Sequence, residues 1–180
     1  SSTPISGRRL HVASVLEVIR SRRSVRRFDA GPVDDMLVDE ILDAGRWAPS
    51  GLNNQPWRFA VITEQGLVMQ LSRLTRYSRI VREASVLIAV FLDTAASYDR
   101  TKDVQAIGAC IQNMLLAVHA LGLGGVWLGE ILGNAVEVRR LLGAPEDYEL
   151  MAVIAVGRPS GPPPDAPSRK ELASLVFFRK

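Results

Sequence analysis

The chain has 180 residues, of which 47% are hydrophobic and 23% charged, and its formal net charge is +3. This length and composition predict one globular domain with a sizeable core and exclude an intrinsically disordered protein. No apolar run is long enough to cross a bilayer, no signal-peptide core is visible, and one cysteine excludes an internal disulfide, so we expect a cytoplasmic protein without membrane contact.

The first half of the chain is predicted to mix helices with strands. Apolar residues at helical spacing define the helices, and runs without alternation or turn residues define the buried strands. Prolines, glycine and paired asparagines mark a break between them. In chain order we expect a helix over 11–22, a helix over 33–46, a loop over 48–56, a strand over 57–63, a helix over 65–75 and a strand over 85–92.

The second half continues the same pattern and ends in a proline-rich arm. Asn134 and Glu137 are spaced almost as in a capping box, which predicts a helix start there. The mixture of helices and strands indicates an α+β or mixed α/β sandwich. We expect a helix over 104–121, a strand beginning within 122–131, a helix over 134–142, a strand over 149–157 and an extended arm over 157–167. The tail ends on Phe177 and Phe178, which is apolar for a free end and indicates docking, for example on another subunit.

Several catalytic classes lack their motifs. His11 and His119 have no partners at metal-ligand spacing, and Ser50 does not lie in a G-x-S-x-G elbow. No P-loop occurs, and GLGGVWLG fails the dinucleotide fingerprint because Trp127 stands where the third glycine is needed. Cys110 lies in an apolar helix and is expected to be buried and inert. An enzyme without these groups must take its chemistry from a cofactor.

Two polar stretches are candidates for binding such a cofactor. RSRRSVRRF (20–28) places five arginines around Ser24, a set that suits a phosphate; alternation would put Arg22, Ser24 and Arg26 on one side and Arg23 on the other. A solvated basic face or a nucleic-acid surface are the alternatives. In APSGLNNQPW (48–57), amide side chains match the donors and acceptors of a heteroaromatic ring edge, although a plain polar turn fits equally.

Taken together and in order, these motifs resemble the FMN-dependent nitroreductase family. The resemblance rests on RRSxR, APSxxNxQPW, QNMLLA, GLGxxWxG and a GRP arm that leads to Arg169, and it covers essentially all of residues 11–176. It implies an α+β fold, a three-layer α-β-α sandwich that forms an intertwined homodimer with FMN at the subunit interface. The implied organisation is a flexible segment over 1–10, one FMN-binding domain over 11–160 and a partner-docking arm over 161–180.

The resemblance also implies a role for individual residues. Arg22, Arg23, Ser24 and Arg26 would hold the FMN phosphate and ribityl chain, and Arg169 would close over the same phosphate. Pro49, Ser50, Gly51, Asn53 and Gln55 of the partner subunit would line the flavin ring. Leu128 and Gly129 match the place where a backbone N–H faces flavin N5. No metal and no catalytic side chain are implied.

The implied reaction passes electrons from NADH or NADPH through flavin N5 to a small acceptor, a nitroaromatic or a quinone, by a ping-pong mechanism. Only 93–103 fills the gap in which longer relatives carry a lid, so an open flavin face is expected. A flavin-binding sensor or carrier without NAD(P)H turnover is the alternative. A nucleic-acid-binding domain is disfavoured because no helix-turn-helix, zinc or RNP pattern occurs.

Overall fold

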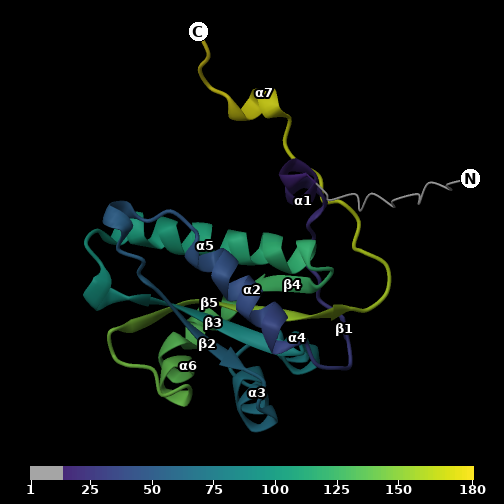
Figure 1. Cartoon of the computed structure of the whole chain (residues 1–180), viewed down its shortest axis with the longest axis vertical. Helices are drawn as coiled ribbons and strands as arrows, with labels where there is room; N and C mark the ends of the chain where they lie inside the picture. The colour runs from purple at the N-terminus through teal and green to yellow at the C-terminus, as the bar shows by residue number, and fades with distance from the viewer. Residues whose placement is uncertain (1–13) are drawn as a thin grey trace, which may run out of the picture.

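The computed structural model describes residues 14–180 as helices packed on an antiparallel sheet (Figure 1). The segment predicted over 1–10 lies outside the described residues. The sheet order is β1-β5-β3-β2, and β4 also pairs with β5, so the long β5 contacts three other strands. The strands are β1 (Phe28–Asp29), β2 (Trp57–Ile62), β3 (Val86–Asp93), β4 (Gly124–Leu128) and β5 (Tyr148–Pro159).

Helices cover both faces of this sheet. One core cluster joins α2 and α5 to the sheet, and the other joins α3, α4 and α6 to it. The helices are α1 (Val15–Ser21), α2 (Asp35–Arg46), α3 (Gln65–Ser72), α4 (Ser78–Glu83), α5 (Arg100–Ala120), α6 (Ala135–Leu141) and α7 (Leu172–Leu175). The predicted mixture of helices and strands in one fold is therefore confirmed, and the antiparallel pairing of the strands is a finding of the structure.

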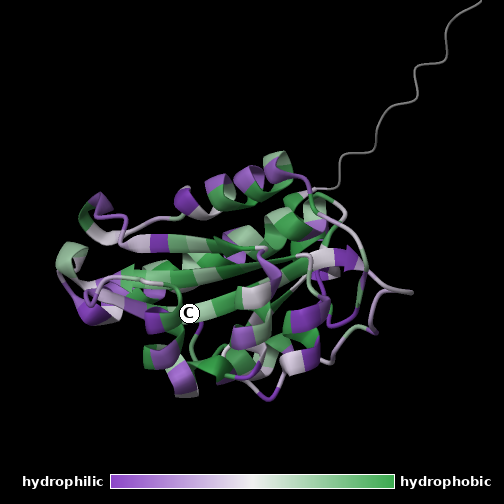
Figure 2. Cartoon of the chain, turned by 90° about the horizontal axis from the view of Figure 1, so that it is seen from below, coloured by the Kyte–Doolittle hydropathy of each residue, from purple (hydrophilic) through white to green (hydrophobic). Residues whose placement is uncertain are grey.

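Strand β3 shows why the sheet is central. All eight of its residues are buried, as its unbroken apolar sequence predicts, and alternate side chains enter the two core clusters. Val86, Ile88 and Val90 face α2 and α5, whereas Leu87 and Ala89 face the opposite helices. Figure 2 shows the hydrophobic strands running between helices that are mixed in polarity.

Some predicted boundaries were wrong. The helix predicted over 104–121 begins at Arg100, because the Asp99 side chain accepts a hydrogen bond from the backbone of Lys102 and caps it. Asn134 makes no capping bond; its side chain instead donates to the carbonyl of Leu74, at 2.8 Å. The reciprocal capping box is found at Ser14 and Glu17 of α1. The short elements β1 and α4 were not predicted.

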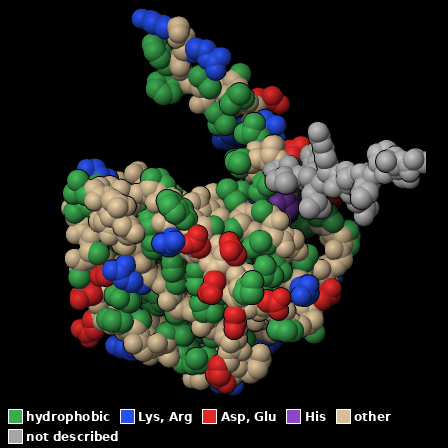
Figure 3. Space-filling model, viewed as in Figure 1, with side chains coloured by type: hydrophobic (Ala, Val, Ile, Leu, Met, Phe, Trp, Pro, Cys, Tyr) green, Lys and Arg blue, Asp and Glu red, His purple; other side chains and the backbone are tan. Residues whose placement is uncertain are grey.

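The end of the C-terminal arm, with α7, stands away from the body (Figure 1). Strand β5 includes the first residues of the stretch predicted to be an arm, and every residue over 160–180 is exposed (Figure 1). Figure 3 shows hydrophobic side chains along this arm, and Phe177 and Phe178 are among the exposed residues. Within residues 14–180, no helix combines the length and apolar character needed to cross a bilayer.

Candidate functional site

The arginine-rich segment is fixed to the start of β4. The chain leaves α1 at Arg22, and Ser24 forms a bridge to Gly125, whose carbonyl accepts a hydrogen bond from the Val25 backbone at 3.0 Å. A Cβ on Gly124 would lie 2.7 Å from the Val25 side chain, so only glycine lets the segment approach so closely. The basic segment is therefore held against the sheet at one point.

Five of the predicted residues line one cavity of about 240 Å³ here. Its walls bring four guanidinium groups together with a serine hydroxyl and one carboxylate. The lining residues are Arg22, Arg23, Ser24, Arg26, Arg169, Asp165, Pro164 and Pro167. None of the four arginines forms an ion pair with another residue of 14–180. The cavity, called the arginine cavity below, thus offers excess positive charge suited to a phosphate.

Arg23 does not follow the predicted alternation. It lines the arginine cavity together with Arg22, because the segment is not a continuous strand. Its guanidinium donates to the carbonyls of Arg20 and Arg22, at 2.8 and 2.9 Å. All the arginines predicted to bind phosphate therefore lie on one cavity.

The pKa of His119 is affected by the positive charge of this region. It lies near the end of α5, and its Nε2 is 2.8 Å from the Ser21 hydroxyl. Burial, and then the positive charges of Arg22 and Arg23, lower the pKa of His119 below its ordinary value. The arginines therefore create a positive potential that an anion would offset.

The predicted ring-binding loop has an unusual backbone. Leu52, Asn53 and Gln55 have φ of 55°, 53° and 47°, a left-handed region that residues with a Cβ rarely adopt. The loop is closed by a hydrogen bond of 3.1 Å from the Gln55 backbone to the Ser50 hydroxyl. Arg58 donates to the Gln55 carbonyl at 3.0 Å. The side chains of Asn53 and Gln55 remain exposed.

Sequence reasoning missed two residues beneath this loop. The side chain of Asn54 donates to the carboxylate of Asp103, at 2.7 Å, and Asp103 is fully buried. Burial alone would raise the pKa of Asp103, but hydrogen bonds from Ser97, Asn54 and two backbone N–H groups lower it overall. Asp103 was missed because the predicted helix began one residue later. Its spacing from Ile107 and Ile111 could have placed it on the buried face.

The loop and the arginine cavity lie at opposite ends of α5 (Figure 1). Asn54 contacts Asp103 at the start of the helix, and Ser21 contacts His119 near its end. Sixteen helical residues separate these contacts, which corresponds to roughly 24 Å at 1.5 Å per residue. One chain alone therefore does not bring both halves of the predicted site onto one small ligand.

Leu128 and Gly129 lie at the far end of β4 from the arginine segment. Gly129 follows Gly125 by four residues, so about 13 Å of strand separates them. Leu128 is buried, whereas Gly129 is exposed and nothing lies within 4 Å of the position a Cβ would take. The next residue, Glu130, accepts hydrogen bonds from the Thr75 hydroxyl at 2.5 Å and the Arg76 backbone at 3.2 Å. This stretch is thus fixed while its backbone stays accessible.

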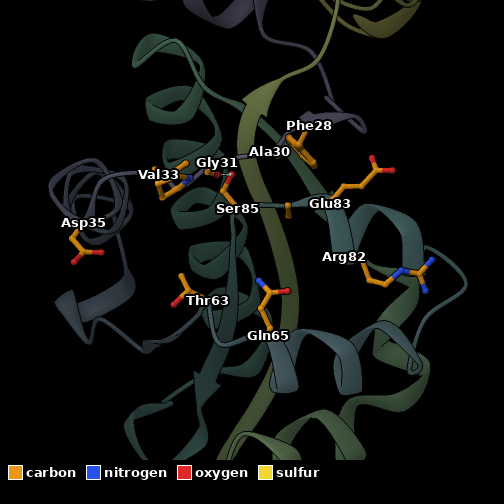
Figure 4. A pocket seen from close by; sticks show the side chains of 12 residues that line it. Phe28, Ala30, Gly31, Val33, Asp35, Thr63, Gln65, Arg82, Glu83 and Ser85 are labelled. Carbon is orange, nitrogen blue, oxygen red and sulfur yellow. Dashed lines mark hydrogen bonds between the residues drawn. The ribbon is translucent and has the colours of Figure 1, made fainter.

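A larger cavity, of about 570 Å³, contains none of the predicted residues. It lies where β1 and the loop after it meet α4 and the start of β3 (Figure 4). The Ser85 hydroxyl in this cavity donates a hydrogen bond to the Gly31 carbonyl at 2.7 Å, so its proton is not available to a ligand. In Figure 4 the side chains of Arg82 and Glu83 extend to one side of the view, and Asp35 lies on the opposite side. No charged groups converge there, so size alone does not make it the site.

Comparison with known proteins gives consistent matches along the chain. A model of the Nitroreductase family matches residues 19–75 and 63–158. A protein of Methanothermobacter thermautotrophicus, provisionally named as an NADH dehydrogenase/NAD(P)H nitroreductase, is 37% identical over 151 residues, 83% of this chain and 79% of that protein.

Solved structures are similar over nearly the whole chain. A provisionally named nitroreductase from Desulfovibrio desulfuricans, crystallised with FMN, is 48% identical with a TM-score of 0.88, over 93% of this chain and 98% of that one. The NADPH:FMN oxidoreductase of Vibrio harveyi, complexed with NAD+, is 25% identical with a TM-score of 0.84, over 92% of this chain and 77% of that one.

Proposed function

Because the chain belongs to the nitroreductase family, we propose that it is an FMN-dependent oxidoreductase using NADH or NADPH. The observation that carries the proposal is the arginine cavity, in which four guanidinium groups and the Ser24 hydroxyl surround about 240 Å³. A phosphate monoester carries close to two negative charges and three acceptor oxygens near neutral pH, and this lining fits it. FMN has such a phosphate, so the residues present fit the cofactor.

The rest of β4 fits the same ligand. The exposed Gly129 backbone lies about 13 Å further along the strand, so an elongated molecule anchored in the arginine cavity can reach it. We propose that the N–H of Gly129 faces flavin N5, where a donor stabilises an electron-rich ring. Without a side chain at Gly129, the backbone can approach closely.

The chemistry is supplied by the cofactor. Bound FMN would supply hydride and electron transfer between NAD(P)H and a second small molecule, which we propose is a nitroaromatic or a quinone. The chain contributes position and charge, and no side chain is proposed to transfer a proton. Only the short turn Thr94–Ala96 and three further residues separate β3 from α5, so little covers a flavin at this end. One open site that serves donor and acceptor in turn would give ping-pong kinetics.

We further propose that two copies share each site, as an intertwined homodimer of three-layer sandwiches. The support is the distance of roughly 24 Å between the two half-sites along α5. Exposed apolar side chains provide the surface: Val15, Leu16 and Ile19 on α1, and the arm over 161–180. An apolar groove of about 400 Å³ also lies between α1 and α5. Contiguous apolar surface of this kind marks protein contacts.

Cys110 supports the expected compartment. It is buried, and burial raises the pKa of its thiol to about 12, so the protein has no readily ionised cysteine among residues 14–180. This fits a protein that makes no disulfide, and we place the activity in the cytoplasm.

An absorption spectrum tests the proposal. The purified chain is saturated with FMN and titrated anaerobically with NADPH and, separately, NADH. Flavin bands that bleach with either donor, and that return when a quinone or nitroaromatic is added, are expected. A protein that takes up no FMN refutes the flavin site. Bound flavin that stays oxidised with both donors refutes the NAD(P)H reaction.

A further inference from the structure

We propose that the loop over 48–56 lines the flavin ring, as the family resemblance implies, and its backbone conformation is one that its residues rarely adopt. Three of its residues, Leu52, Asn53 and Gln55, lie in the left-handed region, and none is glycine. Such a conformation persists only when surrounding contacts hold it. Within the loop, the Asn53 and Asn54 backbones donate to the Ser50 and Gly51 carbonyls, and Gln55 bonds to the Ser50 hydroxyl and the Asn53 carbonyl. Contacts from outside the loop add to these; one is Arg58, which donates to the Gln55 carbonyl at 3.0 Å.

The strongest candidate for a second such contact is the buried carboxylate of Asp103. One of its oxygens accepts hydrogen bonds from the Ser97 hydroxyl at 2.5 Å and from the Tyr98 and Asp99 backbones at 3.0 and 3.2 Å. Its other oxygen accepts only from the Asn54 side chain, at 2.7 Å. A single fully buried carboxylate thus joins the start of α5 to the middle of the loop.

Asn54 is oriented by this contact. Its amide nitrogen donates both to Asp103 and to the Ala96 carbonyl, at 3.1 Å. A flipped amide would place its oxygen against two acceptors, so only one orientation is favourable. The amide oxygen is buried and has no hydrogen-bond partner in the described part of the chain. Since burying an unpaired acceptor is unfavourable, satisfying Asn54 itself does not account for the arrangement.

Closing the start of α5 accounts for only one of the two carboxylate oxygens of Asp103. The N-cap of α5 is Asp99, whose carboxylate accepts from the Lys102 backbone at 3.0 Å. Asp103 lies a full turn further on and reaches back to the residues before the helix. Asp103 therefore contacts the helix start through one oxygen and the loop through the other, whereas Asp99 contacts the helix start alone.

We propose that Asp103, acting through Asn54, is a positioning residue for the flavin. Asn54 points inward and anchors the loop, so its neighbours Asn53 and Gln55 are presented outward in one fixed geometry. This proposal rests on the proposed function, because it requires that the loop lines the flavin ring. Asp103 itself does not touch the ligand.

The test compares two variants that break the anchor with one that weakens only the helix cap. Asn54→Ala removes the donor. Asp103→Asn keeps the shape of the side chain. Its amide oxygen should stay with the three donors Ser97, Tyr98 and Asp99, so its amide nitrogen would face the Asn54 side chain, which needs an acceptor there. Asp99→Ala is the matched control at the same helix start. The full chain is used throughout, with FMN affinity from flavin fluorescence, visible circular dichroism of the bound flavin, and unfolding temperature.

The two anchor variants are expected to bind FMN about tenfold more weakly, because a smaller fraction of the loop is in the binding geometry, and to change the visible dichroism. Asp99→Ala should lower the unfolding temperature yet keep the FMN dissociation constant within about twofold of the wild type. If wild type binds FMN and both anchor variants match it in affinity and dichroism, the positioning role is overturned while the proposed function stands. If wild type binds no FMN, the proposed function fails and this inference with it.

Discussion

Replacing Arg22 with alanine removes one of the four guanidinium groups around the arginine cavity. A hydrogen bond to a charged group contributes about 1.5–3 kcal/mol, and the partial exposure of Arg22 places the loss toward the lower value. Each 1.4 kcal/mol is a factor of ten, so the FMN dissociation constant should rise about 10- to 30-fold. Riboflavin has the same ring without the phosphate, so its affinity should barely change. Fluorescence titration of both flavins at fixed salt measures the two constants.

Arg27→Ala is the matched control. Arg27 belongs to the same basic segment and is exposed, but it lines a neighbouring cavity with Val25 and Pro159 and not the arginine cavity. The reasoning is refuted if Arg27→Ala weakens FMN as much as Arg22→Ala, since the segment would then act as a diffuse positive surface. An equal loss for riboflavin and FMN in Arg22→Ala would also refute it, since phosphate would not be what the arginine binds.

Three further outcomes are expected. Gly45→Ala places a Cβ 2.8 Å from the Met114 side chain at the α2–α5 contact, and should lower the unfolding free energy in urea by about 1–3 kcal/mol; an unchanged midpoint would show that the helices separate easily. FMN should raise the pKa of His119 in an NMR titration, because phosphate offsets the arginine charges that help to lower it; a pKa unmoved at saturation would place the phosphate elsewhere. The pKa of Asp103 is lowered in the fold, so its contribution to stability should be complete above the unfolded value of about 3.9 and be lost as the pH falls through the folded value. In Asp103→Asn the unfolding free energy should fall less steeply as the pH is lowered than it does in the wild type. An equal slope in the two proteins would show that Asp103 does not make this contribution.

Long periodic segments were predictable, whereas short elements and the sheet order were not. The helix over 33–46 and the buried strand over 85–92 are found as α2 and β3, because burial on one or both faces leaves a repeating apolar pattern. β1 has two residues and α4 six, too few to show a period. Strand β5 pairs with β1, β3 and β4, which lie far from it in the sequence, and a local sequence pattern cannot predict such pairs.

The candidate site divides in the same way. The arginines over 20–27 predicted an anion site, and three of them do converge on the arginine cavity. The fourth arginine of the cavity, Arg169, comes from the other end of the chain, and only the family resemblance predicted it. The loop's shape was not predictable, because Leu52 and Gln55 have no preference for positive φ. That shape is set by tertiary contacts, of which Asn54 to Asp103 is the clearest.

The length of α5 has a consequence for mixtures of variants. With one half-site at each end of a 21-residue helix, a two-copy assembly would build each site from the arginines of one chain and the loop of the other. A chain defective at Arg22 and a chain defective at Asn53 would each form inactive pairs. In a mixed pair, both defects would fall in the same site and the second site would be intact. Combining two inactive proteins should therefore restore about half of the normal flavin sites per mixed pair, a genetic complementation set by helix length.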